Sequence, residues 1–307
     1  MSHTDRINKA IDSSSSAQSL ISAVRGMMMQ DALVPDGADL DGLCDAYLRY
    51  AIDLVREFSP VKGMYDSLLY KYDAANLKLC MKSSLRSLPY PLLFPYGTVP
   101  ADKVASAVDS RDFSAFPDGL RRGCGTALEA YAKTGDPMNV DLEIDRGVFE
   151  DITDSAKKSG SDVLTELASL DADSANVTAY ARICRLDMTV EGKRELFSRS
   201  FVCGGRIDRK TFPADMTAEA LFAALSQTYL GNTLRPARDK DEPIPAIEDA
   251  LRRRRSMICD RVRFVPFSAD VPAAYIVERE AEVRAFTLIS AYIGRGASQT
   301  EIRAALA

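Results

Sequence analysis

A short polar phrase recurs along this chain, and it constrains the fold more than any other feature of the sequence. It begins as Asp-x-x-Asn followed by an aliphatic residue, and its third occurrence is weaker than the first two. The repeated positions are Asp73, Asn76 and Lys78 in the first copy, Asp173 and Asn176 in the second, and Glu282 and Arg284 in the third. Internal repeats indicate repeated structural units. We therefore expect three related units, as in a spacer, adaptor or scaffold rather than an enzyme with a single pocket.

The apolar residues follow the period of amphipathic helices. From Asp39 to Phe58 they recur three and four positions apart, which places them on one helix face, and Asp39 can cap the start. Residues 65–87 continue the same period until two prolines stop it. Alternating runs of β-branched residues are few, and no Asn-Gly or Asp-Gly hairpin is flanked by them. These patterns predict an all-α protein.

A glycine turn and a short helix are expected after each long helix. The short helices are predicted over 101–108, from Arg209 onward, and over 299–306, where Ser298 and Glu301 can form a capping box. Gly204-Gly205 lacks the Lys-Ser/Thr of a phosphate-binding loop, so we interpret it as a turn.

Three helical subdomains are predicted from these boundaries. They span 1–108, 109–212 and 213–307, and the proline-containing segment 231–246 is the best boundary before the third. The first fifteen residues are polar and rich in serine, so this end is expected to fray.

Composition narrows the class of protein. The chain has 307 residues and a formal net charge of −5, which argues against broad nucleic-acid binding. Its six cysteines form no C-x-x-C pair, so the sequence predicts no metal site and fits a reduced, cytosolic compartment. No apolar run approaches the roughly 20 residues that span a bilayer. Any membrane association is therefore expected to go through a partner.

Two charged stretches are candidates for contact with partners. One is the basic cluster Arg252, Arg253, Arg254 and Arg255. The other is acidic and runs from Asp141 to Asp154. Such asymmetry suits docking between oppositely charged surfaces, whereas two solvated helix faces remain the simpler interpretation.

Catalytic chemistry has little support. The only histidine is His3, so a serine or cysteine nucleophile would lack its usual base, and no cofactor is expected. Glu278 and Glu282 are four apart and could share a helix face, but a solvated face laced by Arg279 and Arg284 is the favoured interpretation. The Asp-x-x-Asn pairs are interpreted as structural braces in preference to the lining of a cavity.

Several motifs together resemble the C subunit of the V/A-type ATPase and ATP synthase, whose family includes the d subunit of the eukaryotic V-ATPase. They are the first Asp-x-x-Asn copy, the turn Phe-Pro-Tyr-Gly-Thr-Val at 94–99, the second copy, Ile247-Glu248-x-x-Leu251, the segment from Pro272 to Arg284, and Ile302-Arg303. The resemblance covers roughly residues 40–306. Residues 1–38 match the family poorly.

This resemblance implies a funnel of three similar helical subdomains about a pseudo-threefold axis. It also implies a non-catalytic part of the rotor that couples the central shaft subunits, of the D/F type, to the membrane proteolipid ring. The chain would then lie on the cytoplasmic face of the membrane and take part in ATP synthesis or hydrolysis with ion transport. Two alternatives stay open: a helical-repeat module that binds proteins or peptides, and a helical enzyme that uses Glu278, Glu282 and a divalent metal.

Overall fold

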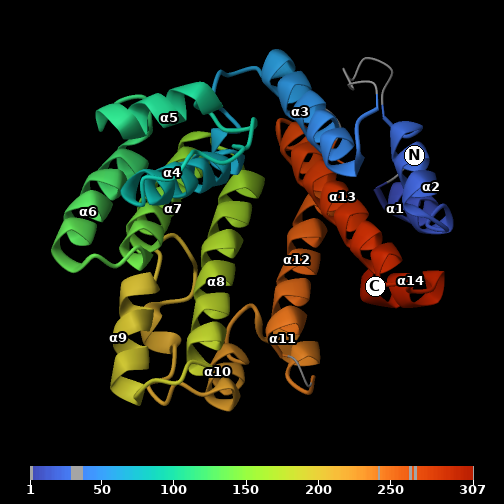
Figure 1. The fold of residues 1–307 in the computed structure, drawn as a ribbon. Coiled ribbons are helices and arrows are strands. Elements are labelled where there is room, and N and C mark those ends of the chain that lie inside the picture. The colour runs from blue at the N-terminus through green and yellow to red at the C-terminus, as the bar shows by residue number, and fades with distance from the viewer. Residues whose placement is uncertain (1–2, 29–36, 241–242, 263–264, 266–267, 307) are drawn as a thin grey trace. The chain divides into compact units, whose positions relative to one another are not determined.

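A computed structural model describes residues 3–28, 37–240, 243–262, 265 and 268–306. Within these residues the protein is helical and has no strand, which confirms the all-α prediction (Figure 1). The α-helices are α1 (His3–Asp12), α2 (Ala17–Arg25), α3 (Leu40–Phe58), α4 (Tyr70–Leu85), α5 (Ala101–Ser110), α6 (Asp118–Thr134), α7 (Met138–Lys158), α8 (Asp162–Cys184), α9 (Val190–Ser200), α10 (Ala218–Leu225), α11 (Gly231–Leu234), α12 (Pro243–Val262), α13 (Asp270–Gly294) and α14 (Gln299–Leu306). Short 3-10 turns are η1 (Asp66–Leu68), η2 (Arg209–Thr211) and η3 (Arg235–Ala237).

The chain divides into two compact units. Unit 1 combines Met1–Lys62 with Val262–Ala307, and unit 2 is Gly63–Arg261. The segment 231–246, expected to be a linker, contains α11 and the start of α12. The division into three subdomains and the funnel arrangement remain predictions.

Unit 1 is built around the contact of α3 with α13. Asp39 caps α3 as expected, because its side chain accepts a hydrogen bond from the backbone N–H of Gly42 at 2.9 Å. Tyr47 on α3 and Phe286 on α13 lie with ring centroids 6.3 Å apart in the core. Helices α1, α2 and α14 pack on this pair, so both ends of the described chain belong to one core.

The expected fraying of the first fifteen residues is not what the structure shows. Residues 3–12 form α1, and its Ala10 and Ile11 are buried in the core of unit 1. The serine run has a structural role after α1, because Ser16 and Ser19 form a capping box at the start of α2. The polar composition of this segment predicted fraying, but α1 is ordered because it buries an apolar face in the core of unit 1.

Unit 2 contains a closely packed helix pair, α6 and α7. Gly119 on α6 faces Gly147 on α7, and a Cβ on either glycine would overlap the carbonyl oxygen of the other. A Cβ on Gly123, one turn later, would likewise overlap the carbonyl oxygen of Glu143. Glycine is required at these positions by the approach of the two backbones. Helix α7 in turn packs on α4 and α8, which carry the first two motif copies.

The short helices predicted after the glycine turns are found in two of the three copies. Helix α5 follows the first turn, and α14 follows the third, with the expected Ser298–Glu301 capping box. The second turn leads only into the 3-10 turn η2, and the next α-helix begins at Ala218. Asp208 caps η2 through the backbone N–H of Lys210 and Pro213 follows closely, so one turn forms and then stops.

Candidate functional site

The first motif copy holds a loop of its own unit. Asp73 and Asn76 on α4 are fully buried. The Asn76 amide donates to the carbonyl oxygen of Phe94 and accepts from the Phe94 N–H, both at 2.8 Å. The Asp73 carboxylate accepts from the N–H groups of Thr98 and Val99 at 3.0 and 3.1 Å and from the Thr98 hydroxyl at 2.6 Å. We call this arrangement the first clasp.

The second motif copy on α8 repeats this arrangement. Asn176 donates to the carbonyl oxygen of Val202 and accepts from its N–H, both at 2.9 Å. Asp173 accepts from the N–H groups of Arg206 and Ile207 at 2.9 and 3.0 Å. This second clasp holds its loop at the same spacing, because Val202 precedes Arg206 by as many positions as Phe94 precedes Thr98.

Each clasp also requires a glycine. A Cβ at Gly97 would overlap the carboxylate of Asp73, and a Cβ at Gly205 would overlap that of Asp173. Neither glycine has a positive φ, so the requirement is closeness to the carboxylate. Each glycine turn expected from the sequence therefore packs directly against the aspartate of its motif copy.

The two clasps obtain their hydroxyl donor from different places. In the first, the hydroxyl belongs to Thr98. In the second, Arg206 occupies that position, and the hydroxyl of Tyr229 donates to Asp173 at 2.7 Å instead. The Arg206 guanidinium lies over the Tyr229 ring, 5.6 Å from its centroid. Burial raises the pKa of Tyr229, so this hydroxyl keeps its proton and donates.

The third copy on α13 is built from charges. Arg279 and Glu282 stand at the positions of the aspartate and asparagine, and both are fully buried. Their side chains are 2.8 Å apart, and the Tyr47 hydroxyl on α3 donates to Glu282 at 2.5 Å. Arg6 on α1 donates to the Tyr47 hydroxyl at 3.1 Å and lies 3.8 Å from Glu282. We call these four residues the buried charge network.

This geometry corrects the favoured interpretation of the third copy. A solvated face was expected around Glu282 and Arg279, but those two side chains point into the core of unit 1, and only Arg284 is exposed. The reason is that positions 279 and 282 lie on the face of α13 that packs against α3. Glu278 remains beside Arg279 at 3.5 Å, and its side chain is four-fifths buried.

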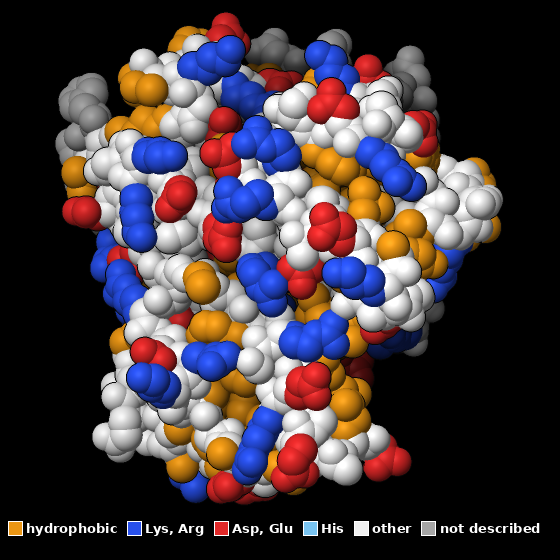
Figure 2. Space-filling model, turned by 90° about the vertical axis from the view of Figure 1, so that its left-hand side faces the viewer, with side chains coloured by type: hydrophobic (Ala, Val, Ile, Leu, Met, Phe, Trp, Pro, Cys, Tyr) orange, Lys and Arg blue, Asp and Glu red, His pale blue; other side chains and the backbone are white. Residues whose placement is uncertain are grey.

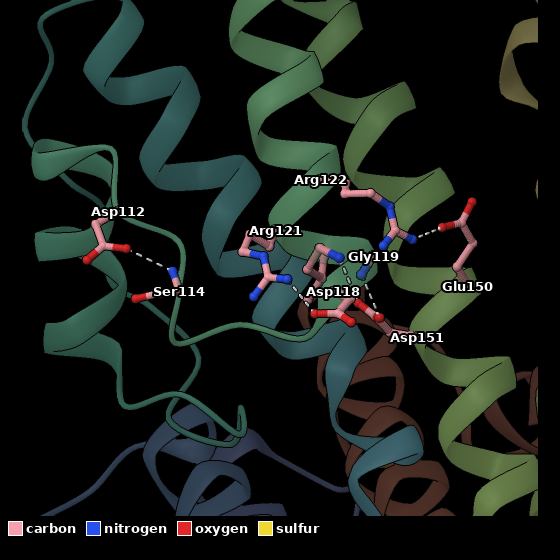
Figure 3. A network of polar contacts seen from close by, with 9 residues as sticks. Asp112, Ser114, Asp118, Gly119, Arg121, Arg122, Glu150 and Asp151 are labelled. Carbon is pink, nitrogen blue, oxygen red and sulfur yellow. Dashed lines mark hydrogen bonds and ion pairs between the residues drawn. The ribbon is translucent and has the colours of Figure 1, made fainter.

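A further carboxylate binds backbone in unit 2. Asp151 on α7 accepts from the N–H groups of Gly119 and Leu120 at 2.8 and 2.7 Å, at the first turn of α6 (Figure 3). Burial raises the pKa of Asp151, while these two hydrogen bonds and Arg122 oppose the rise. Asp151 therefore caps a helix other than its own.

Most of the other acidic side chains of this stretch are also paired within unit 2. Lys78 and Lys82 on α4 bind Asp145 and Asp141 on α7, the second pair at 2.8 Å. Arg122 on α6 binds Glu150 at 2.7 Å (Figure 3). On the face shown in Figure 2, Lys and Arg side chains are interspersed with Asp and Glu side chains. Because of these ion pairs, the acidic stretch is not a continuous surface of one sign.

The arginine cluster on α12 makes contacts inside the chain as well. Arg252 pairs with Asp249 of the same helix. Arg255 binds Asp171 at 3.0 Å, and Arg254 lies 3.9 Å from Glu166, both on α8. Arg253 is exposed. The role of this cluster as a partner interface remains a prediction, and Arg253 is its most accessible member.

Thiol chemistry finds little support in the geometry. Four cysteines are buried: Cys44, Cys80, Cys124 and Cys259. Burial raises the pKa of Cys44 and of Cys124 to about 12, so neither thiol is reactive near neutral pH. Among the described residues, no group of three or more His, Cys, Asp or Glu side chains could hold a metal ion. No described helix is long and apolar enough to cross a bilayer.

One hollow opens on the surface of unit 2, with a volume of about 480 Å³. It lies between the C-terminal end of α4 and the start of α7, and its apolar lining includes Leu79, Leu88 and Met138. Leu92, in the following loop, is 92% exposed. Charged side chains of both signs complete the hollow, so its lining does not select one class of ligand.

Comparison with known proteins identifies the family of this chain. The family of the ATP synthase (C/AC39) subunit matches residues 26–305. The chain belongs to this family. It is 23% identical over 288 residues to the C subunit of the A-type ATP synthase of Pyrococcus abyssi, and 24% identical over 285 residues to that of Pyrococcus horikoshii. Each alignment covers 86% of this chain and 74% of the relative. The resemblance inferred from the motifs is confirmed.

Sequence reasoning found the motif residues and missed their partners. Thr98, Tyr229, Tyr47 and Arg6 complete the clasps and the buried charge network, and none of these contacts was predicted from the sequence. A signal existed for Thr98, which follows the glycine of the first turn. For the other three no local pattern points to the contact.

Proposed function

We propose that this chain is a non-catalytic adaptor in the rotor of a V/A-type ATP synthase or ATPase. It would act as a socket that joins the central shaft subunits to the membrane proteolipid ring on the cytoplasmic face. Rotation passed through it would couple ATP synthesis or hydrolysis to ion transport. The match of residues 26–305 to the ATP synthase (C/AC39) subunit family carries this proposal.

The geometry supports an adaptor in a second way. The most buried polar groups of unit 2 are bonded to the backbone of the same unit through the two clasps. A ligand site needs polar groups that are free to bind a ligand. In the buried charge network Glu282 is likewise occupied by Tyr47 and Arg279. The motif thus serves rigidity, which a part that transmits torque requires.

The proposal is tested by binding. The purified chain is incubated with the cognate shaft subunits and, separately, with the detergent-solubilised proteolipid ring across a salt series. We expect binding to both, with one interface weakened by salt because exposed charges are screened. Binding to neither by a folded helical chain would contradict the rotor role and favour the peptide-binding module.

Charge reversal of the arginine cluster needs care in that experiment. Arg254 and Arg255 face acidic groups on α8, so reversing them changes the protein itself. Arg253→Glu alters the most exposed member of the cluster, and it is used as the probe of a partner contact on that ground alone. Its matched control is Lys103→Glu on α5, which makes the same change of charge at an exposed position in the same unit. Loss of one partner with Arg253→Glu alone would support the cluster as an interface.

A further inference from the structure

Three sets of ion pairs join α12 to α8 along their lengths. Arg182 on α8 binds Glu248 at 2.6 Å, and Asp171 binds Arg255 at 3.0 Å. Glu166, near the start of α8, binds Arg261 and lies 3.9 Å from Arg254. As the position falls along α8 it rises along α12, so the helices run antiparallel. We call these pairs the α8–α12 ladder.

The rungs differ in their exposure to water. The Arg182 side chain is 64% exposed, and that of Arg261 is 61% exposed, so both outer rungs are open to screening. In the middle rung the Arg255 side chain is only 16% exposed. The partly shielded middle rung is therefore screened least by salt, and the exposed outer rungs make the ladder salt-sensitive.

The other groups that hold α12 are apolar. Ile247, Leu251 and Ile258 are buried, and their spacing places them along one face of the helix. Burial of apolar surface is not directional, and packed helices can slide past one another by small steps. An ion pair with defined geometry resists such sliding. The ion pairs thus restrict sliding of α12 along its axis, whereas the apolar contacts do not.

We propose that the α8–α12 ladder is a salt-sensitive latch that fixes the position of α12 along α8. Helix α12 is the last element of unit 2, and the chain enters unit 1 at Val262. Release of the latch would loosen this helix. The proposal does not depend on the rotor role, since it concerns the isolated chain.

Hydrogen exchange of the α12 amides tests the latch. Asp171→Arg removes the middle rung and places two arginines together, so we expect exchange in α12 about tenfold faster. The double variant Asp171→Arg with Arg255→Asp restores opposite charges and should restore protection. In the unaltered protein, 1 M salt shortens the Debye length to about 3 Å and should speed exchange in the same helix.

A matched control separates the latch from a general effect of charge. Glu150→Arg breaks an exposed pair between α6 and α7, whose backbones are already held by glycine contacts. We expect no change of exchange in α6. If 1 M salt leaves α12 exchange unchanged in the unaltered protein, the ladder is only a set of solvated charges and the proposal fails. The salt measurement decides the question even if a variant does not fold.

Discussion

The three motif copies differ in the groups that bind their buried carboxylates. In unit 2, Asp73 and Asp173 bind backbone N–H groups of a loop that follows in the same unit. In unit 1, Glu282 binds the side chains of Tyr47 and Arg279. A loop can be held by neutral and charged acceptors alike, whereas a buried carboxylate without N–H donors needs a cation. The third copy therefore carries an arginine where the others carry an aspartate.

The largest expected effect breaks the third copy. Arg279→Met leaves the Glu282 carboxylate buried without its nearest cation, so we expect the free energy of unfolding to fall by about 3–5 kcal/mol. Urea denaturation followed by circular dichroism measures this. Arg284→Met, on the exposed face of the same helix, is the control and should change stability by less than about 0.5 kcal/mol.

The double variant sharpens that result. Arg279→Met with Glu282→Leu removes both charges, and replacing a buried pair by apolar side chains is often nearly neutral. We expect the double variant to be more stable than Arg279→Met alone. If the double variant is less stable, the network stabilises the protein by more than the neutralisation of Glu282 by Arg279. The contrast with the clasps would then be wrong.

The next effect breaks the clasps through their glycines. Gly97→Ala and Gly205→Ala each place a Cβ against a buried carboxylate, so we expect losses of about 1–3 kcal/mol in unfolding free energy. Gly125→Ala on α6 is the control, because its Cβ would meet no atom within 4 Å. That variant should be stabilised by up to about 1 kcal/mol. Equal behaviour of Gly97→Ala and Gly125→Ala would refute the role of the first clasp.

A smaller effect compares the two clasps with each other. Tyr229→Phe removes one hydroxyl donor from Asp173, and we expect a loss of about 1–2 kcal/mol. Arg206→Thr places a hydroxyl at the position that Thr98 occupies in the first clasp. It should therefore recover part of the loss in the double variant. Thermal denaturation of the four proteins in this cycle gives the coupling, and zero coupling would show that the two donors are not equivalent.

The smallest effect concerns Asp151, which binds two backbone N–H groups without an asparagine beside it. Because burial raises the pKa of Asp151, its carboxyl group binds a proton more readily in the folded protein than in the unfolded chain. The contribution of Asp151 to stability is then present below its ordinary pKa and declines as pH rises through the raised value. The stability of the unaltered protein minus that of Asp151→Asn should decrease over this range. If this stability difference increases with pH instead, the prediction for Asp151 is wrong.

The sequence predicted elements better than the contacts between them. Helical period and Asp39 located α3, and the repeat located α4, α8 and α13, because these signals lie in neighbouring residues. The clasps join positions far apart in the chain, such as Asn76 to Phe94 and Asp173 to Tyr229. Local patterns do not encode such pairings. The glycine turns were recognised as turns, but not as partners of the motif.

The error at the third copy has a specific cause. Charged side chains three and four apart on a helix are usually solvated, and this rule placed Glu282 and Arg279 in water. Their burial depends on Tyr47, which comes from a helix near the other end of the chain. The arginine cluster was likewise interpreted from α12 alone, although its acidic partners are on α8. In both cases the deciding residue lies on another helix.

Hydrogen exchange of the free chain and of the chain bound to shaft subunits and proteolipid ring tests the central claim most directly. We expect the loops 94–99 and 202–207 to be protected already in the free chain, because the clasps hold them. Binding should add protection at other, exposed segments. If these two loops exchange freely in the free chain and become protected only on binding, the motif serves a partner and the claim is contradicted.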